Sequence, residues 1–324
     1  KPVKGVLSIV SFAKEKGFEE IFLPKQNAKE AALIDGIKIF PAETLLDVVN
    51  HLKEEENFCL DLQPKTEIDF KEAKSKVCFS DVRGQESAKR GLMIAAAGGH
   101  NIAMYGPPGT GKTMLARAFV GILPKMSKED ILEITAIHSV AGTLPEEALV
   151  TDVPFRSPHA TSSYVSVIGG GAYPKPGEVT LAHKGVLFLD EFPEFDRRVL
   201  ESLRQPLEDR VVHISRSKGS AVYPTDFILI AAMNPPPDDA TAADIVRFKR
   251  KISGPIMDRI DIWVNVLNVD YDKLSSKEKE GQTSEEIKEK VLNARSKQNK
   301  RLSNKGKKLN TQMNVKDMDE LINL

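Results

Sequence analysis

The chain has 324 residues, of which 41% are hydrophobic and 28% charged, a composition that excludes disorder throughout and suits about two or three globular domains. Its 46 basic and 46 acidic residues give a formal net charge of zero, which argues against a protein that coats nucleic acid by bulk charge but is compatible with a local basic patch. The two cysteines cannot form a disulfide scaffold and no apolar run reaches the ~20 residues that span a bilayer, so we expect a cytoplasmic protein without a membrane partner.

Residues 1–53 alternate helical and strand patterns and form the first predicted domain. Hydrophobic periodicity assigns its elements in chain order as helix Val6–Lys16, strand Glu20–Pro24, helix Ala28–Leu33, strand Lys38–Phe40 and helix Ala42–Leu52. The first residue is not methionine and no apolar signal region follows it, so we interpret the sequence as part of a longer protein. Residues 54–78 are charged and weakly periodic, which is typical of a linker.

Residues 79–269 repeat a strand, a glycine-rich loop and a helix, which predicts an α/β core of three layers with a mostly parallel sheet. Two continuous apolar runs, Gly185–Leu189 and Phe227–Met233, suit strands that are buried on both faces. Between the helices and strands of this core, Thr151–Leu181 is rich in Gly, Pro and Ser and is expected to be a flexible loop or hairpin. Residues 270–324 are rich in Lys and Glu at helical spacing, which predicts part of a helical lid.

The most informative motif is a glycine-rich loop between a strand, Ile102–Tyr105, and a helix, Met114–Val120. The loop consists of Gly106, Pro107, Pro108, Gly109, Thr110, Gly111, Lys112 and Thr113. Backbone N–H groups of such a loop, together with the helix N-terminus, bind the phosphates of ATP; the lysine reaches the β- and γ-phosphates and the threonine holds Mg²⁺. A chance match is the weaker interpretation, because the required strand and helix both flank the loop.

Two of the buried strands end in polar residues that would complete a nucleotide site. Asp190 and Glu191 follow one strand; the first would hold Mg²⁺ through water and the second would polarise the attacking water. Asn234 follows the other strand, where an amide can orient water without adding charge. As alternatives, the two acids are solvated charges at a strand end, and Asn234 is a turn residue before three prolines.

These motifs resemble those of an AAA+ ATPase, and more specifically those of the Mg-chelatase-like YifB/ComM competence-protein family. The phrases that carry the resemblance are IHSVAG at Ile137–Gly142, FRSPH at Phe155–His159, IGGG at Ile168–Gly171, KPG at Lys175–Gly177, LRQPLED at Leu203–Asp209 and SGPIMDRID at Ser253–Asp261. The resemblance covers nearly the whole chain. It implies a P-loop AAA+ core in a homo-oligomer, expected to be a hexameric ring that hydrolyses ATP, and for the competence member a motor that acts on branched DNA.

The N-terminal domain resembles the C-terminal part of the ribosomal S5/Lon protease-like α+β domain that these proteins share. Proteolysis is not expected, because Leu7 occupies the position that matches the catalytic lysine of that fold. The chain also lacks the cysteine-rich loop that family members carry after the asparagine, and Ala160 replaces the second histidine of their PHHT sequence. We therefore expect no structural metal at either place, and His159 is expected to have a hydrogen-bonding role.

The resemblance assigns Arg259 to the nucleotide of the neighbouring subunit, as an arginine finger of the kind worth ~10³–10⁵ in rate in other NTPases. The alternative is an ion pair within the chain, with Asp258 or Asp261. In Val211–Tyr223, residues that alternate in polarity flank a Lys-Gly turn, and this pattern predicts a β-hairpin. In related ring motors such a hairpin faces the central pore, so Arg216 and Lys218 would contact DNA phosphates; the alternative is that they are surface residues without a function.

Three functions are compatible with these patterns, all of them with ATP and Mg²⁺. The first is an ATP-hydrolysing ring motor that remodels or translocates on DNA, as a DNA helicase or translocase does. The second is a Mg-chelatase-type motor subunit for metal insertion, and the third is a nucleotide-binding assembly module with little turnover. The N-terminal domain favours the first, because the chelatase motor subunit lacks it.

Overall fold

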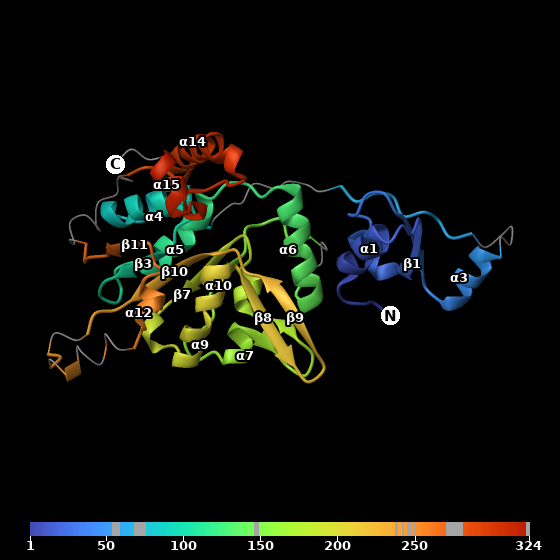
Figure 1. Cartoon of the computed structure of the whole chain (residues 1–324), viewed down its shortest axis with the longest axis horizontal. Coiled ribbons are helices and arrows are strands. Elements are labelled where there is room, and N and C mark those ends of the chain that lie inside the picture. Colours follow the sequence, from blue (N-terminus) through green and yellow to red (C-terminus); the bar gives the residue numbers. More distant parts are fainter. Residues whose placement is uncertain are drawn as a thin grey trace. The chain divides into compact units, whose positions relative to one another are not determined.

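The computed structural model describes residues 1–53, 59–67, 76–145, 149–236, 239–241, 243, 244, 248, 251–269 and 281–321. They form two compact units (Figure 1): unit 1 is Lys1–Glu72 with Met126–Asp152, and unit 2 is Ala73–Lys125 with Val153–Leu324. This division differs from the predicted domains, because a segment from inside 79–269 belongs to unit 1. None of the described helices is both long and apolar enough to cross a bilayer.

Unit 1 is built on two parallel strands, β1 (Glu20–Pro24) and β2 (Lys38–Ala42). Its helices are α1 (Val6–Glu15), α2 (Ala28–Ala31), α3 (Leu45–Leu52) and α6 (Lys128–Ala141). Helix α6 packs on α1, and the backbone N–H of Gly5 donates to Ser139 Oγ at 2.9 Å. Part of the predicted linker also belongs here, since Gln63 N–H donates to the carbonyl of Ile39 at 2.9 Å.

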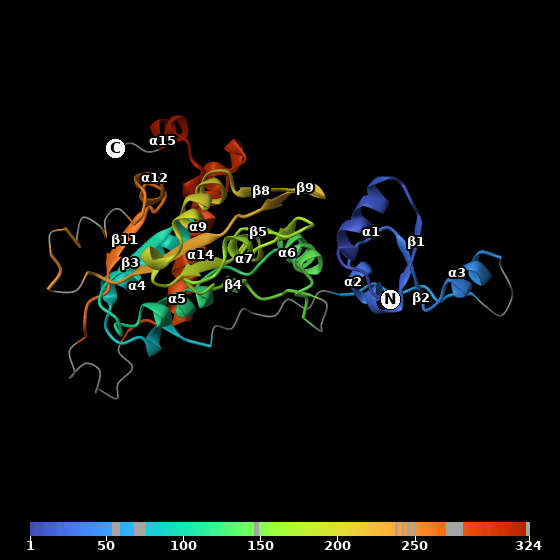
Figure 2. The same ribbon diagram turned by 90° about the horizontal axis from the view of Figure 1, so that it is seen from below.

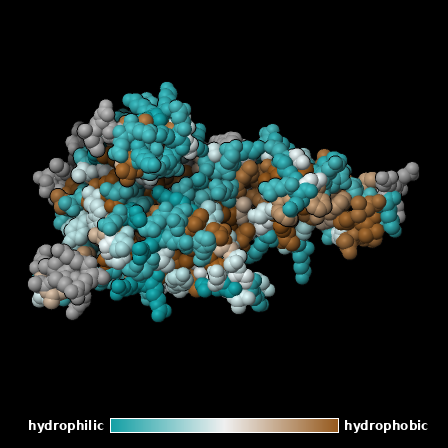
Figure 3. All heavy atoms as spheres, viewed as in Figure 1, coloured by the Kyte–Doolittle hydropathy of each residue, from teal (hydrophilic) through white to brown (hydrophobic). Residues whose placement is uncertain are grey.

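Helix α3 is amphipathic, and none of its residues is buried. It begins at Leu45 and not at the predicted Ala42, because Thr44 and Asp47 form a capping box in which each side chain accepts a backbone N–H of the other residue. Leu45 is 79% exposed and Leu52 65%. Figure 3 shows the resulting hydrophobic surface over this helix.

Unit 2 contains a five-stranded parallel sheet in the order β11-β3-β10-β7-β4. Its strands are β3 (Ile102–Tyr105), β4 (Phe155–Arg156), β7 (Val186–Leu189), β10 (Ile228–Met233) and β11 (Ile262–Asn265). The two predicted apolar strands, β7 and β10, are buried along their whole length. The α/β class predicted from the sequence is confirmed. Thr151–Leu181, predicted as a flexible loop or hairpin, contains a short antiparallel strand pair at residues 169–176 and also the edge strand β4, which was not predicted.

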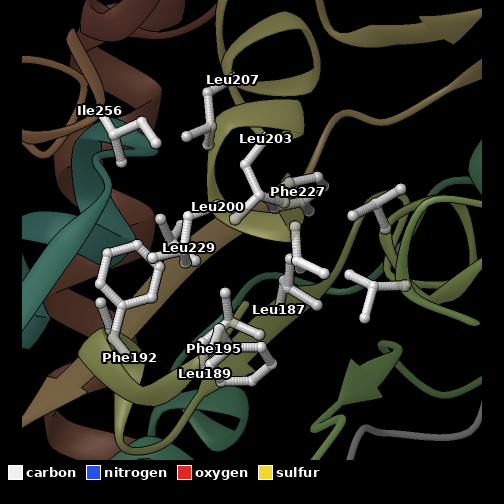
Figure 4. Packing of buried hydrophobic residues seen from close by; sticks show 14 of the residues in the cluster. Leu187, Leu189, Phe192, Phe195, Leu200, Leu203, Leu207, Phe227, Leu229 and Ile256 are labelled. Carbon is white, nitrogen blue, oxygen red and sulfur yellow. The ribbon is translucent and has the colours of Figure 1, made fainter. Parts of the chain in front are cut away.

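Helices cover both faces of this sheet and give three layers. On one face lie α4 (Glu86–Gly98) and α5 (Lys112–Gly121), with α14 (Ser284–Leu302) packed on them. On the other face the sheet packs against α9 (Arg197–Ser202), α10 (Arg204–Asp209) and α12 (Gly254–Met257). Figure 4 shows this second layer, in which Leu187, Leu229 and Leu203 meet in one cluster.

Two short antiparallel pairs complete unit 2. The predicted hairpin consists of β8 (Val211–Arg216) and β9 (Gly219–Pro224), and Arg216 pairs with Gly219 around a two-residue turn. The second pair, β5 (Gly169–Gly170) and β6 (Lys175–Pro176), lies between α7 (Tyr164–Val167) and α8 (Glu178–Leu181). Helix α15 (Val315–Leu321) follows α14 near the end of the chain.

Leu229 tests the packing of the central strand, because its side chain is fully buried in the cluster of Figure 4. We expect Leu229→Ala to lower the free energy of unfolding by about 2–5 kcal/mol, through lost burial and the cavity left behind. Trp263 is the single tryptophan and lies on β11, so its fluorescence during urea unfolding reports on unit 2. The control is Leu292→Ala, at a side chain of α14 that is 44% exposed, and an equal loss in both variants would contradict the packing described.

Candidate nucleotide-binding site

The glycine-rich loop lies at the carboxyl end of β3, between the ends of β10 and β11. A Cβ on Gly106 would lie 1.9 Å from the carbonyl oxygen of Val266, so no other residue fits there. The N–H of Gly106 donates to the carbonyl of Met233 at 3.1 Å. The loop thus lies against the end of β10 and the residue that follows β11, at the carboxyl edge where the order of the strands reverses.

Two further glycines shape the loop for a different reason. Gly109 and Gly111 have left-handed backbones, with φ of +78° and +91°, and no atom lies within 4 Å of the Cβ that either would carry. They are required by conformation and not by crowding, and they leave open space above the loop. Helix α5 begins at Lys112, two residues before the predicted Met114, and no side chain caps its N-terminus, so the N–H groups of its first turn can bind a phosphate.

Lys112 is only 6% exposed and folds back on the loop. Its Nζ donates to the carbonyl oxygens of Gly106 and Pro107, each at 2.6 Å. Burial lowers the pKa of Lys112, and the nearby carboxylate of Asp190 partly opposes this shift. Two neutral carbonyls are weaker partners for an ammonium than a phosphate, so the cradle suits a polyphosphate ligand.

Thr113 and Asp190 meet across the site, although 77 residues separate them in the sequence. Thr113 Oγ1 donates to Asp190 Oδ2 at 3.0 Å, and Asp190 Oδ1 accepts the N–H of Glu191 at 3.0 Å. A hydroxyl and a carboxylate are the hard oxygen donors that Mg²⁺ prefers. Nowhere in the described residues do three His, Cys, Asp or Glu side chains gather to hold a metal, so an ion here would also need water and phosphate oxygens.

Glu191 and Asn234 follow β7 and β10 at the same edge of the sheet. Glu191 is exposed and has a left-handed backbone, with φ of +51°, which is uncommon for a residue other than glycine. The fully buried Phe192 holds the chain immediately after it. Asn234 follows Met233, the partner of Tyr105 in the sheet, so it lies beside the start of the loop. The carboxyl ends of three adjacent strands thus bring the loop, the acids and the amide to the same edge of the sheet.

Arg259 has an intrachain partner, but neither of the two considered from the sequence. Its Nε and Nη2 donate to Oε1 of Glu208 at 3.0 and 2.6 Å. The Asp261 carboxylate instead accepts the N–H of Asn101 at 3.1 Å and lies 3.2 Å from His100 Nδ1. The Arg259 guanidinium holds the pKa of Glu208 below its usual value. The side chain of Arg259 is 47% exposed.

Gln85 was missed from the sequence, although it fixes the loop. Its backbone is left-handed, with φ of +61°, and its Nε2 donates to the carbonyls of Thr110 at 3.3 Å and Leu267 at 2.6 Å. The Gln85 side chain therefore connects the glycine-rich loop to the segment that follows β11. The signal was weak, since a Gly-Gln pair before a helix also suits an ordinary turn.

Two of the family phrases meet in an ion pair. Arg156, in FRSPH, donates from Nε and Nη2 to the two carboxylate oxygens of Glu178, which follows KPG, at 2.6 and 2.8 Å. This bidentate contact connects β4 to α8. His159 lies in a local turn, where its Nδ1 is 2.8 Å from Thr161 Oγ1.

Arg216 and Lys218 lie on the β8–β9 hairpin and are not part of the site around the glycine-rich loop. Both are exposed. Arg216 Nη2 is 3.5 Å from the carbonyl oxygen of Gly169, and Lys218 Nζ lies 4.8 Å from the centre of the Tyr173 ring.

Comparison with known proteins gives one family match and several relatives. Residues 78–274 match the family described as magnesium chelatase, subunit ChlI. The competence protein ComM of Haemophilus influenzae is 39% identical over 98% of this chain and 63% of its own length. YifB of Escherichia coli is 40% identical over 92% of this chain and 60% of its own length. The magnesium-chelatase 67 kDa subunit of Chlorobaculum parvum is 28% identical over 49% of this chain and 23% of its own length.

Lys112 tests the phosphate cradle. We expect Lys112→Ala to weaken the binding of a non-hydrolysable ATP analogue by about 100-fold or more, because phosphate charge loses its buried ammonium partner. Titration calorimetry measures the affinity, and Lys297→Ala, at an exposed lysine of α14, is the control. Unchanged affinity in Lys112→Ala would place the nucleotide elsewhere.

Proposed function

The chain belongs to the magnesium chelatase, subunit ChlI family, among the relatives of ComM and YifB, and on this premise we propose that it hydrolyses ATP in a ring motor that acts on DNA. The observation that carries the ATPase proposal is the convergence of three groups at one edge of the sheet: the buried ammonium of Lys112, the Thr113–Asp190 hydrogen bond and the exposed Glu191. The chain spans 63% of the length of ComM, so the activity of the whole protein is part of the proposal.

In this proposal the loop N–H groups and Lys112 bind the β- and γ-phosphates of ATP. Thr113 and Asp190 hold Mg²⁺, which supplies charge neutralisation at the phosphate oxygens. Asn234 orients a water and Glu191 accepts its proton as the water oxygen bonds to the γ-phosphorus; the bond from that phosphorus to the bridging oxygen breaks, and ADP leaves. The left-handed backbone of Glu191 supports this role, because strained residues are concentrated at functional sites.

We favour DNA over a tetrapyrrole metal-insertion complex as the substrate, because the similarity to ComM covers more of this chain than the similarity to the chelatase subunit does. The similarity to ComM covers 98% of the chain and therefore includes residues of both units, whereas the similarity to the chelatase subunit covers 49%. Arg216 and Lys218 supply exposed positive charge on a projecting hairpin, which suits contacts with DNA phosphates. DNA-stimulated ATP hydrolysis by the full-length protein is the direct test, and no stimulation would favour the assembly or metal-insertion alternatives.

The ring is supported by the position of Arg259. Its guanidinium lies half-exposed on Glu208, so a phosphate of an adjacent subunit can compete for it. We propose a homo-oligomer, expected to be a hexamer, in which Arg259 acts as an arginine finger toward the neighbouring nucleotide.

Glu191 tests the chemistry. We expect Glu191→Gln to keep nucleotide affinity within about 3-fold but to lower kcat by about 100-fold or more, because an amide can hold the water but cannot take its proton. Phosphate release at saturating ATP measures kcat, and Glu289→Gln on the exposed side of α14 is the matched control. Normal turnover in Glu191→Gln would show that this residue is only a charge at the end of a strand.

Arg259 tests the ring. In the full-length protein we expect Arg259→Ala to bind nucleotide normally but to lose hydrolysis, because the guanidinium stabilises charge that develops on the γ-phosphate of the adjacent subunit. Mixing Arg259→Ala subunits with Lys112→Ala subunits should restore part of the activity, since an intact phosphate site can then lie beside an intact finger. No recovery in rings shown to be mixed would leave Arg259 as the intrachain partner of Glu208.

A further inference from the structure

The β5–β6 turn and the β8–β9 hairpin pack as a single projection from unit 2 (Figure 2). Gly169 lies directly on the buried Ile214: a Cβ on the glycine would be 2.5 Å from the Cδ1 of the isoleucine. The hydroxyl of Tyr223 on β9 donates to the carbonyl of Pro174 in the turn at 2.9 Å. The relative position of the two tips is therefore fixed by contacts. We call residues 171–175 and 215–219 together the two-turn surface.

An exposed aromatic ring lies on the two-turn surface beside a cation. Tyr173 is 60% exposed, and Lys218 Nζ lies 4.8 Å from its ring centre, in cation–π contact. Tyr173 remains exposed although the ammonium lies over its ring, so a second flat partner can reach the side chain. An aromatic face with an ammonium next to it is the combination by which proteins hold an unpaired base and its phosphate.

The charge of this part of the chain is one-sided, although the whole chain is neutral. Residues 157–177 and 211–225 contain no Asp or Glu, and Lys175, Arg216 and Lys218 are all exposed. Glu178, just beyond the first segment, is held by Arg156 and is not available to neutralise these cations. The projection therefore presents positive charge without an acidic neighbour in either segment.

We infer that the two-turn surface binds single-stranded DNA, with an unpaired base stacked on Tyr173 and the flanking phosphates on Lys218 and Arg216. This inference rests on the proposed DNA function and adds to it the strandedness of the substrate and a stacking residue. The preference follows from the ring, because a base presents its face only when it is not stacked within a duplex. Lysine and arginine alone would bind the phosphates of single-stranded and of duplex DNA.

Fluorescence anisotropy with labelled oligonucleotides tests the inference in the full-length protein. We expect Tyr173→Ala to weaken binding of a dT oligonucleotide by about 10-fold, the usual loss of one stacked base, and to leave duplex binding unchanged. Tyr173→Phe keeps the ring and should bind as the wild type does. Tyr164→Ala removes a second exposed tyrosine, on α7 and outside the surface, and should have no effect. Lys218→Ala should weaken the binding of both single-stranded and duplex DNA. It should also lower the slope of log affinity against log salt concentration by about one phosphate contact.

The outcomes separate this inference from the proposed function. If the wild type binds DNA but Tyr173→Ala loses nothing, or loses the same factor for single strand and duplex, the stacking role is wrong while DNA binding stands. If the wild type binds neither form of DNA, the DNA function itself fails. Tighter binding of an oligo(U) RNA than of the dT oligonucleotide would overturn the assignment to DNA. Basal ATP hydrolysis should be unchanged in Tyr164→Ala, because this residue lies outside both the phosphate site and the two-turn surface.

Discussion

The approach of Gly106 to Val266 is the contact on which the rest of the site depends. With no side chain at position 106, the end of β3 can lie against the end of β11, and the N–H of Gly106 remains free to bond to Met233 on β10. The loop that follows therefore starts from a fixed point between three strands. From this point the chain reaches Lys112 within six residues. The Lys112 ammonium bonds to the carbonyls of Gly106 and Pro107, and α5 begins at the same residue. A larger residue here would move the cradle as a whole, because the backbone of β11 cannot yield by itself.

Much of the site was predictable because a parallel sheet makes strand ends equivalent. A buried apolar strand followed by a polar residue places that residue at one edge, so Thr113 and Asp190 were expected together, and they share a hydrogen bond. The same logic predicted β7 and β10 almost to their ends. It failed for β4, since Phe155–Arg156 is too short to show a pattern, although it forms the edge of the sheet.

Partners chosen by tertiary packing could not be predicted. Arg259 pairs with Glu208, which is 51 residues away, because the loop after α12 lies over α10; its sequence neighbours gave no sign of this. Hydrophobic periodicity alone predicts a start of α3 at Ala42, three residues too early, because the local capping box of Thr44 and Asp47 sets the start of the helix. The assignment of α6 to unit 1 also depends on packing, because a helical pattern does not say which core will cover it.

The return of Met126–Asp152 to unit 1 has a consequence for how the chain folds. The contact between Gly5 and Ser139 closes a loop of 134 residues, and that loop contains β3 and α5 of unit 2. The contact between α1 and α6 can form only after residues 73–125 of unit 2 have also been synthesised, so unit 1 cannot be completed before part of unit 2 is present. Cleavage between residues 72 and 73 would separate α1 from its covering helix in sequence and leave two fragments that complete unit 1 only by reassociating.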